Sequence, residues 1–207
     1  MLAILRRPLA IAAAVAAMLG TIQAADAGLI QNGDFETGSL SSWITTGNVT
    51  TAGLPYFGEG STAADGNYYA VFNAGTGVAN GVLSQSFAAI AGTQYSLTYD
   101  YGSNGGQIQS ITAAIKAFGG AVVASQFSTL PAPSGALSPF TLTFFATSTS
   151  NLTLSFTDFS GNPTNSTDGF LDNVALTAVP EPSSLAVMAM GLLFGRGAFR
   201  LRRRARF

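Results

Sequence analysis

The stretch Tyr95-Ser96-Leu97-Thr98-Tyr99-Asp100-Tyr101 decides the fold, because large apolar side chains alternate in it with polar ones. Side chains of a β-strand point in turn to the two faces of its sheet, so the tyrosines and the leucine would share one face. The serine, threonine and aspartate would share the other face. This pattern predicts a strand of an antiparallel sheet with one buried and one solvated side.

The same alternation recurs along the middle of the chain, where helical periodicity is missing. It is clear in 140–144 and 152–156 and weaker in 83–87 and 111–117. Clusters of Gly, Asn and Pro between these segments, such as 131–135, are typical of turns. Many short strands at this spacing predict an all-β fold, an antiparallel β-sandwich.

Two further segments resemble the jelly-roll domains of galactose-binding or carbohydrate-binding-module type. One is Ile30-Gln31-Asn32-Gly33-Asp34-Phe35-Glu36, followed by Trp43, and the other is 169–176, which contains Asp172-Asn173-Val174. The resemblance implies a jelly-roll sandwich in which these segments are the opening and closing strands. We expect Trp43 to lie in the core, where such domains usually bury an aromatic side chain.

Asp172 stands out in the expected closing strand. Alternation places its carboxylate on the same side as Phe170 and Val174, which is the buried side. A buried carboxylate needs either a cation or several hydrogen-bond donors such as backbone amides. Both alternatives remain open on the residues alone.

The jelly-roll resemblance implies a structural calcium, since modules of this kind commonly hold one between acidic residues of the opening and closing strands. The departure from the pattern is Asn173, where many relatives carry a second Asp. Oxygen ligands and the lack of histidine favour calcium over a transition metal. The implied ligands are Asp34 or Glu36 with Asp172, joined by Asp65.

Sugar binding by such a domain would use exposed aromatic side chains. Tyr56 is one candidate because it lies in a glycine-rich segment. Tyr68 is another, because Tyr69 shares the parity of Val71 and should therefore face inward.

The first 27 residues have the features of a secretory signal peptide. Arg6 and Arg7 precede an apolar stretch at 9–19, and Ala25-Asp26-Ala27 fits a signal peptidase site. A retained anchor is the alternative, but this predicted helix is shorter than the roughly 20 residues that span a bilayer. A twin-arginine address is disfavoured by Pro8.

The other end, 179–207, resembles a PEP-CTERM sorting signal. It contains Val179-Pro180-Glu181-Pro182, an apolar run at 185–194 and a close rich in arginine. Arginines beside an apolar span stay cytoplasmic, so a short C-terminal transmembrane helix would tether the domain transiently outside the inner membrane. The resemblance implies that an exosortase-type protease removes the tail and passes the domain to the envelope or the extracellular polysaccharide. An uncleaved tail anchor is the alternative.

The charges divide sharply between the ends and the domain at 28–178. Only Lys116 of the nine basic residues lies in the domain, against eight acidic residues, so the domain carries a net charge of −7. One cation cannot grip a phosphate backbone, which excludes nucleic acid as a partner. Because the chain has no Cys and no His, disulfides, thiol nucleophiles and serine-histidine triads are also excluded.

These features predict a non-enzymatic, exported cell-surface or matrix protein with a structural or adhesive role beside exopolysaccharide. One alternative is a carbohydrate-binding module with a defined glycan ligand. Another is a hydrolase that uses paired carboxylates, the only enzyme class that the missing residue types leave open.

Overall fold

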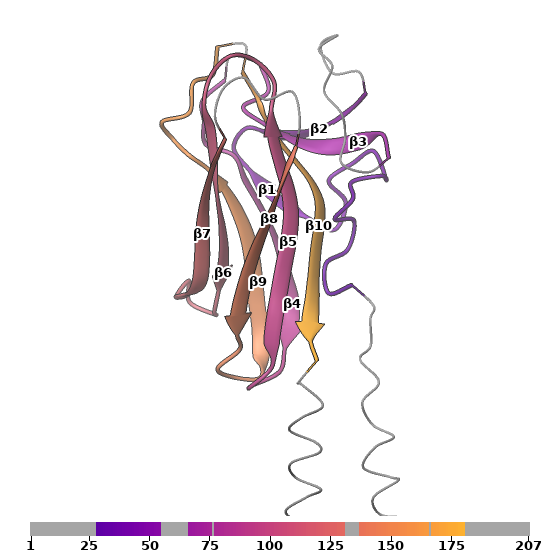
Figure 1. Ribbon diagram of the computed structural model, residues 1–207, viewed down its shortest axis with the longest axis vertical. Helices are drawn as coiled ribbons and strands as arrows, with labels where there is room; N and C mark the ends of the chain where they lie inside the picture. The colour runs from indigo at the N-terminus through magenta and orange to yellow at the C-terminus, as the bar shows by residue number, and fades with distance from the viewer. Residues whose placement is uncertain (1–27, 55–65, 76, 131–136, 166, 181–207) are drawn as a thin grey trace, which may run out of the picture.

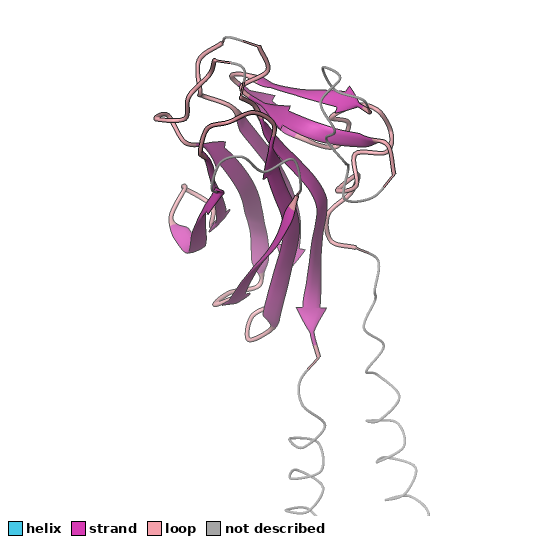
Figure 2. Ribbon diagram, turned by 45° about the horizontal axis from the view of Figure 1, so that its top comes forward, coloured by secondary structure: helices cyan, strands magenta, loops and turns pink. Residues whose placement is uncertain are grey.

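The computed structural model describes residues 28–54, 66–75, 77–130, 137–165 and 167–180. These residues form ten strands in two five-stranded antiparallel sheets that pack face to face (Figures 1 and 2). The predicted all-β sandwich is thereby confirmed. The described residues contain no helix able to cross a membrane. The expected signal helix and the C-terminal helix lie outside the described residues.

Each sheet has its strands in a non-sequential order. Sheet A has the order β1 (Ile44–Thr46), β4 (Val82–Ala89), β9 (Ser150–Asp158), β6 (Gln109–Lys116) and β7 (Val122–Leu130). Sheet B has the order β2 (Val49–Gly53), β3 (Tyr68–Phe72), β10 (Gly169–Val179), β5 (Gln94–Ser103) and β8 (Ser138–Phe145). All five alternating segments of the sequence and the closing segment are strands.

The alternation in β5 builds the core between the sheets. All its large side chains are buried, and the stretch pairs with β8, so that Tyr99 stacks on Phe140 at 5.5 Å between ring centroids. From sheet A, Phe156 meets the edge of the Tyr99 ring at 5.1 Å. Such aromatic contacts add about 0.5–1.5 kcal/mol each to the burial of the rings. The alternating stretch therefore supplies both the strand and the packing layer.

The expected opening strand is wrong. Residues 30–36 form bends and the start of a turn, and Asn32 and Phe35 have φ values of 51° and 55°, outside the extended region of a regular strand. The segment still enters the core, because Phe35 is buried and stacks on Trp43 at 5.8 Å. The indole nitrogen of Trp43 donates a hydrogen bond to the carbonyl of Asn32 at 2.9 Å. The prediction of a core position for Trp43 is confirmed.

A β-bulge in β10 overturns the simple parity argument for the closing strand. The pairing with β5 shifts register between Asp172 and Ala175, and Asn173 has a φ of 51°. The extra residue reverses the sides, so Val174 lies in the core between the sheets, whereas Phe170 packs on the outer face of sheet B. Asp172 is fully buried as predicted, but it does not share a side with Val174.

Strand β10 runs one residue beyond the expected end of the domain. Val179 pairs with Gln94 at the start of β5, and Pro180 follows directly. The Val-Pro-Glu-Pro segment thus begins inside the last strand, without a linker.

Replacement of Gly33 by alanine tests how tightly the N-terminal segment is held against the bulge. A Cβ at Gly33 would collide with the carbonyl of Val174, whose amide donates a hydrogen bond to the Gly33 carbonyl at 2.8 Å. We expect Gly33→Ala to lower the free energy of unfolding by about 1–3 kcal/mol in chemical denaturation, because neighbouring backbone must move. Gly106→Ala is the matched control, since a Cβ there meets nothing within 4 Å. Equal stability of the two variants would contradict the prediction.

Candidate functional site

Glu36 holds the chain that leads into β3. Its Oε1 accepts hydrogen bonds from the backbone amides of Asn67 and Tyr68, both at 2.7 Å. The carboxylate also fills the space where a side chain at Gly66 would lie. The structure therefore brings Glu36 to the residue that follows Asp65, and Asp65 itself lies outside the described residues.

The other predicted calcium ligands are not gathered around Glu36. Asp34 is exposed, and its Oδ1 accepts only a long hydrogen bond of 3.4 Å from the amide of Glu36. Asp172 is fully buried opposite Asp100 of β5, and its Oδ1 accepts a hydrogen bond from the amide of Asn173 at 2.7 Å. Within the described ranges, no three acidic side chains are placed to hold a metal together.

Of the two aromatic candidates, only Tyr68 is described. It is 38% exposed, while Tyr69 is completely buried beside Phe170. The parity argument gave the wrong side for Tyr69, because Tyr69 and Val71 pack with Phe170 on the outer face of sheet B, whereas Ala70 and Phe72 face the core. The Tyr68 ring lies over two glycines. A Cβ added to Gly38 would be 3.3 Å from the ring, and a Cβ added to Gly53 would be 3.1 Å from it. This ring is an exposed platform at the start of β3. Tyr56 lies outside the described residues.

The outer face of sheet A presents a broad surface of hydroxyl groups. Its outward side chains hydrogen-bond across neighbouring strands, with Ser86 to Thr153 at 3.2 Å and Ser110 to Thr129 at 3.0 Å. The hydroxyl-bearing residues at outward positions are Thr46, Ser84, Ser86, Ser110, Thr112, Ser125, Thr129, Thr153, Ser155 and Thr157, of which Ser110 and Ser155 are buried. We call this surface the hydroxyl face.

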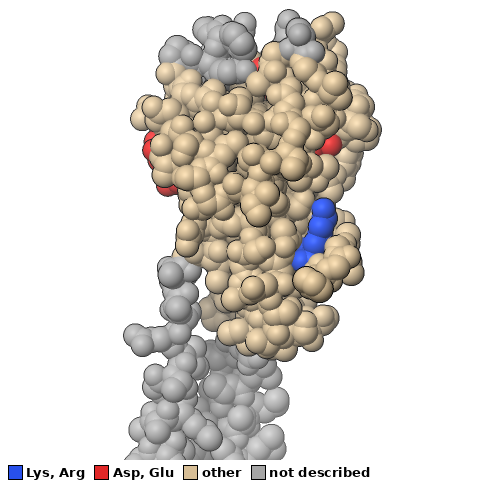
Figure 3. Space-filling model, turned by 180° about the vertical axis from the view of Figure 1, so that it is seen from behind, with Lys and Arg blue, Asp and Glu red and all other residues tan. Residues whose placement is uncertain are grey.

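A single charge lies on the hydroxyl face. Lys116, the only basic residue among the described ones, donates a hydrogen bond from Nζ to Ser155 Oγ at 3.3 Å. None of the described outward side chains in the strands of sheet A is acidic. Figure 3 shows the molecule from this side, with the blue of Lys116 in a largely uncharged surface.

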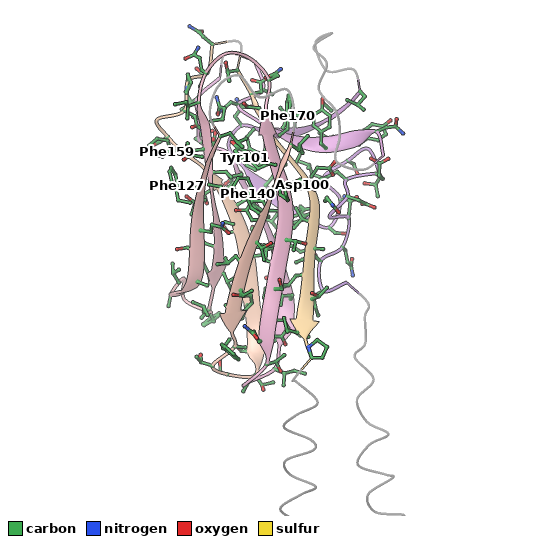
Figure 4. All side chains as sticks on the ribbon, in the orientation of Figure 1. Asp100, Tyr101, Phe127, Phe140, Phe159 and Phe170 are labelled. Atoms are coloured by element: carbon green, nitrogen blue, oxygen red, sulfur yellow. The ribbon has the colours of Figure 1, made fainter. Side chains whose placement is uncertain are left out.

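Apolar side chains stand at both margins of the hydroxyl face. Phe127 on the edge strand β7 is 57% exposed and meets Phe159, 45% exposed, edge-on at 5.5 Å (Figure 4). Ile44 on the opposite edge strand β1 is 69% exposed. We missed the two phenylalanines in the sequence, because neither lies in an alternating run. The signal that could have found them is a large apolar residue among polar neighbours at 125–129 and 157–161.

The hydroxyl face combines two properties that suit a polyhydroxylated ligand. Serine and threonine hydroxyls both donate and accept hydrogen bonds, so they can match sugar hydroxyls in either direction. Exposed aromatic rings add apolar contact for the C–H faces of sugar rings. Among the described strands, no carboxylate lies at an outward position of this face, so these positions hold no carboxylate pair of the kind that glycosidases use.

Residues 178–204 match the PEP-CTERM protein-sorting motif. This motif implies an exported protein that an exosortase sorts, as the arrangement of the C-terminal segment predicts. Among curated proteins, none matches the chain.

Solved structures with the same sandwich include carbohydrate-binding modules. TmCBM61, solved in complex with beta-1,4-galactotriose, aligns with a TM-score of 0.56 and 17% identity over 73% of this chain and 99% of its own. The family 16 carbohydrate-binding module-2 aligns with a TM-score of 0.50 and 15% identity over 72% and 99%. The active domain of bacteriophage CBA120 tailspike protein 4 gives 0.52 and 15%, over 73% of this chain but only 21% of its own. At these identities the likeness is one of fold: the chain is similar to jelly-roll carbohydrate-binding modules and ends in a PEP-CTERM sorting motif.

Proposed function

We propose that this protein is an exosortase-sorted surface protein with a structural or adhesive role, whose sandwich binds extracellular polysaccharide through the hydroxyl face. The observation that carries the proposal is the face itself, on which hydroxyl side chains of neighbouring strands lie beside one lysine, with exposed phenylalanines at its margin. The similarity to the fold of carbohydrate-binding modules supports it.

The charge of the domain favours a neutral polysaccharide. A net charge of −7 over 28–178 repels anionic chains at long range, and Lys116 alone offers local compensation. Uncharged sugars avoid this cost and use the hydrogen bonds of the serines and threonines. Many weak contacts over an extended face suit adhesion to a polymer better than tight capture of one small sugar.

The sorting steps follow from the two ends of the chain. In the proposed order, signal peptidase removes 1–27, the apolar segment at 185–194 tethers the domain to the inner membrane, and an exosortase-type protease releases it at Pro180-Glu181-Pro182. Because β10 ends at Val179, the Pro-Glu-Pro segment follows the last strand directly in the chain.

We also propose that Asp34, Glu36, Asp65 and Asp172 support a structural calcium near the bulge of β10. Two placements favour it: Glu36 lies against Gly66, next to Asp65 in the chain, and Gly33, next to Asp34, bonds to Val174 near Asp172. Such an ion would tie the N-terminal segment to the closing strand.

Removal of the marginal aromatic rings tests the binding face. We expect Phe127→Ala to weaken binding of the exported protein to a neutral polysaccharide such as β-1,4-galactan by about three- to tenfold, since a lost ring contact costs about 0.5–1.5 kcal/mol. Affinity electrophoresis over a panel of neutral polysaccharides measures this. Phe118→Ala is the control, because Phe118 is fully exposed in the turn between β6 and β7.

The same panel separates the proposal from the alternative of a defined sugar site at the tyrosines. Binding that persists in Phe127→Ala and disappears in Tyr68→Ala would assign recognition to the platform at β3. Binding by neither wild type nor variants would refute polysaccharide recognition by the sandwich.

The mature protein should lack both the signal peptide and the C-terminal sorting signal. We expect mass spectrometry of exported material to find a chain without 1–27 and without Phe207, and we expect Glu181→Ala to remain in the membrane fraction. Glu59→Ala serves as a control for loss of one carboxylate elsewhere, because Glu59 is not among the proposed calcium ligands. An intact Phe207 in released protein would contradict sorting by cleavage.

Calcium at the bulge should stabilise the folded state by mass action. We expect the melting temperature of the full chain to rise between chelator and millimolar calcium, and we expect Asp172→Asn to reduce that rise. A melting temperature that is the same in both conditions would reject a calcium site at these four residues.

A further inference from the structure

A layer of polar side chains lies between the two sheets at the end of the sandwich where β10 begins. Asp158 of β9 pairs with Ile111 and so faces the core, and Tyr101 and Ser103 of β5 point toward it from sheet B. Asn73 joins directly after β3. All four residues are almost completely buried, so this end of the core is polar where sandwiches are normally apolar.

Four oxygen atoms of this layer have no hydrogen-bond partner. They are Asp158 Oδ2, Asn73 Oδ1, Tyr101 Oη and Ser103 Oγ. A buried polar atom without a partner costs about 1–3 kcal/mol, and native proteins contain few of them. Four such atoms at one end of the core, contributed by both sheets, are an unusual concentration of unsatisfied oxygens.

The remaining atoms of these side chains are fixed by their neighbours. Asn162 donates to Asp158 Oδ1 at 2.6 Å, which leaves Oδ2 as the open oxygen. Asn73 donates from Nδ2 to Gln109 Oε1 at 3.2 Å, so its own oxygen is the group that stays open. Gln109 is in turn tied to the carbonyl of Pro163 at 2.8 Å. These hydrogen bonds hold the side chains of Asp158 and Asn73 in place and so fix the positions of their open oxygens.

Asp158 has no basic side chain to balance it. Lys116 is the only Lys, Arg or His anywhere in 28–180, and it lies on the outer face of sheet A, bonded to Ser155. Burial raises the pKa of Asp158 to about 6, and the side chain of Asn162, the amide of Phe159, the side chain of Asn73 and the amide of Gly81 offset this only in part. Burial and then the nearby charge of Asp158 raise the pKa of Tyr101 well above its ordinary value, so the phenol stays neutral.

We propose that Asp158 Oδ2, Asn73 Oδ1, Tyr101 Oη and Ser103 Oγ form a buried site for a hard cation, sodium or calcium, that joins the two sheets. Carboxylate, amide and hydroxyl oxygens are the ligands that such ions prefer. The cation supplies the positive charge that the domain lacks and satisfies all four oxygens at once. The site shares no residue with the proposed calcium ligands Asp34, Glu36, Asp65 and Asp172.

Thermal unfolding of the full chain tests the site. After chelation and exchange into tetramethylammonium chloride, sodium or calcium is added at constant ionic strength. We expect one of the two ions to raise the melting temperature by about 5–10 °C at a hundredfold excess over its dissociation constant. The ion that does so at the lower concentration identifies the occupant. No response to either ion would overturn the proposal.

Variants assign the response to this layer. Asp158→Asn should abolish it, and Tyr101→Phe and Ser103→Ala, which each remove one oxygen, should weaken ion affinity at least tenfold in a calorimetric titration. Asp172→Asn should leave this response in place, which separates it from the calcium site at the bulge. If the rise in melting temperature is lost only in Asp172→Asn, the proposal of an ion in the polar layer is overturned. The proposed calcium site at the bulge is then unaffected.

The ion-free state gives a second readout, which also covers poor folding of one variant. Without added ions, Asp158→Asn should be at least as stable as the wild type, because the amide can donate to Asn73 Oδ1 and removes an unbalanced charge. If Asp158→Asn instead loses equal stability with and without ions, the layer holds water rather than a cation and the proposal fails. If Asp158→Asn does not fold, Tyr101→Phe tests the proposal alone. The proposal requires that this variant lose at least tenfold in ion affinity.

Discussion

The hydrogen bond from Val174 to the carbonyl of Gly33 is the constraint on which the arrangement of the sandwich depends. It occurs where β10 bulges, so it fixes the side on which each later residue of the closing strand lies. Beyond the bulge, Val174 and Leu176 fill the core. The same contact anchors the irregular segment that carries Phe35 into the core and Glu36 to the start of β3, so one local irregularity sets the positions of both ends of the domain.

The strands could be predicted from the sequence because their evidence is local. Alternation in 95–101, 140–144 and 152–156 reports directly which side of each strand is buried. The errors arose where a conformation depends on distant partners. Asn32 and Phe35 have positive φ values in a segment that is bonded to Trp43 and Val174, and at the bulge the amide of Val174 bonds to Gly33 instead of to β5. Neither contact can be inferred from the neighbouring residues in the chain.

The candidate sites were harder to predict than the fold for a related reason. Serine and threonine in alternating strands indicate the solvated side of each strand. Whether these side chains form one continuous hydroxyl face depends on which strands are neighbours, here in the order β1-β4-β9-β6-β7. The polar layer likewise requires the ends of β9, β5 and β3 to meet. Parity predicted that Asp172 is buried but gave the wrong side, because the bulge turns Val174 to the core while Asp172 stays on the side of Phe170. Asp158 shares the parity of Leu154 and Phe156, so its inward direction could have been read from its own strand.

Strand β10 connects the two proposed roles of the domain mechanically. Its first residues pair with Ser103 beside the polar layer, and its last residue pairs with Gln94 next to the sorting motif, at opposite ends of the molecule (Figure 1). Because β10 lies inside sheet B, between β3 and β5, a pull along the axis of β10 would load the hydrogen bonds of the β5 ladder together rather than one by one. An ion that joins the sheets at the far end would resist the same displacement. A tethered domain that adheres to a polymer would need this resistance while its tail is still attached.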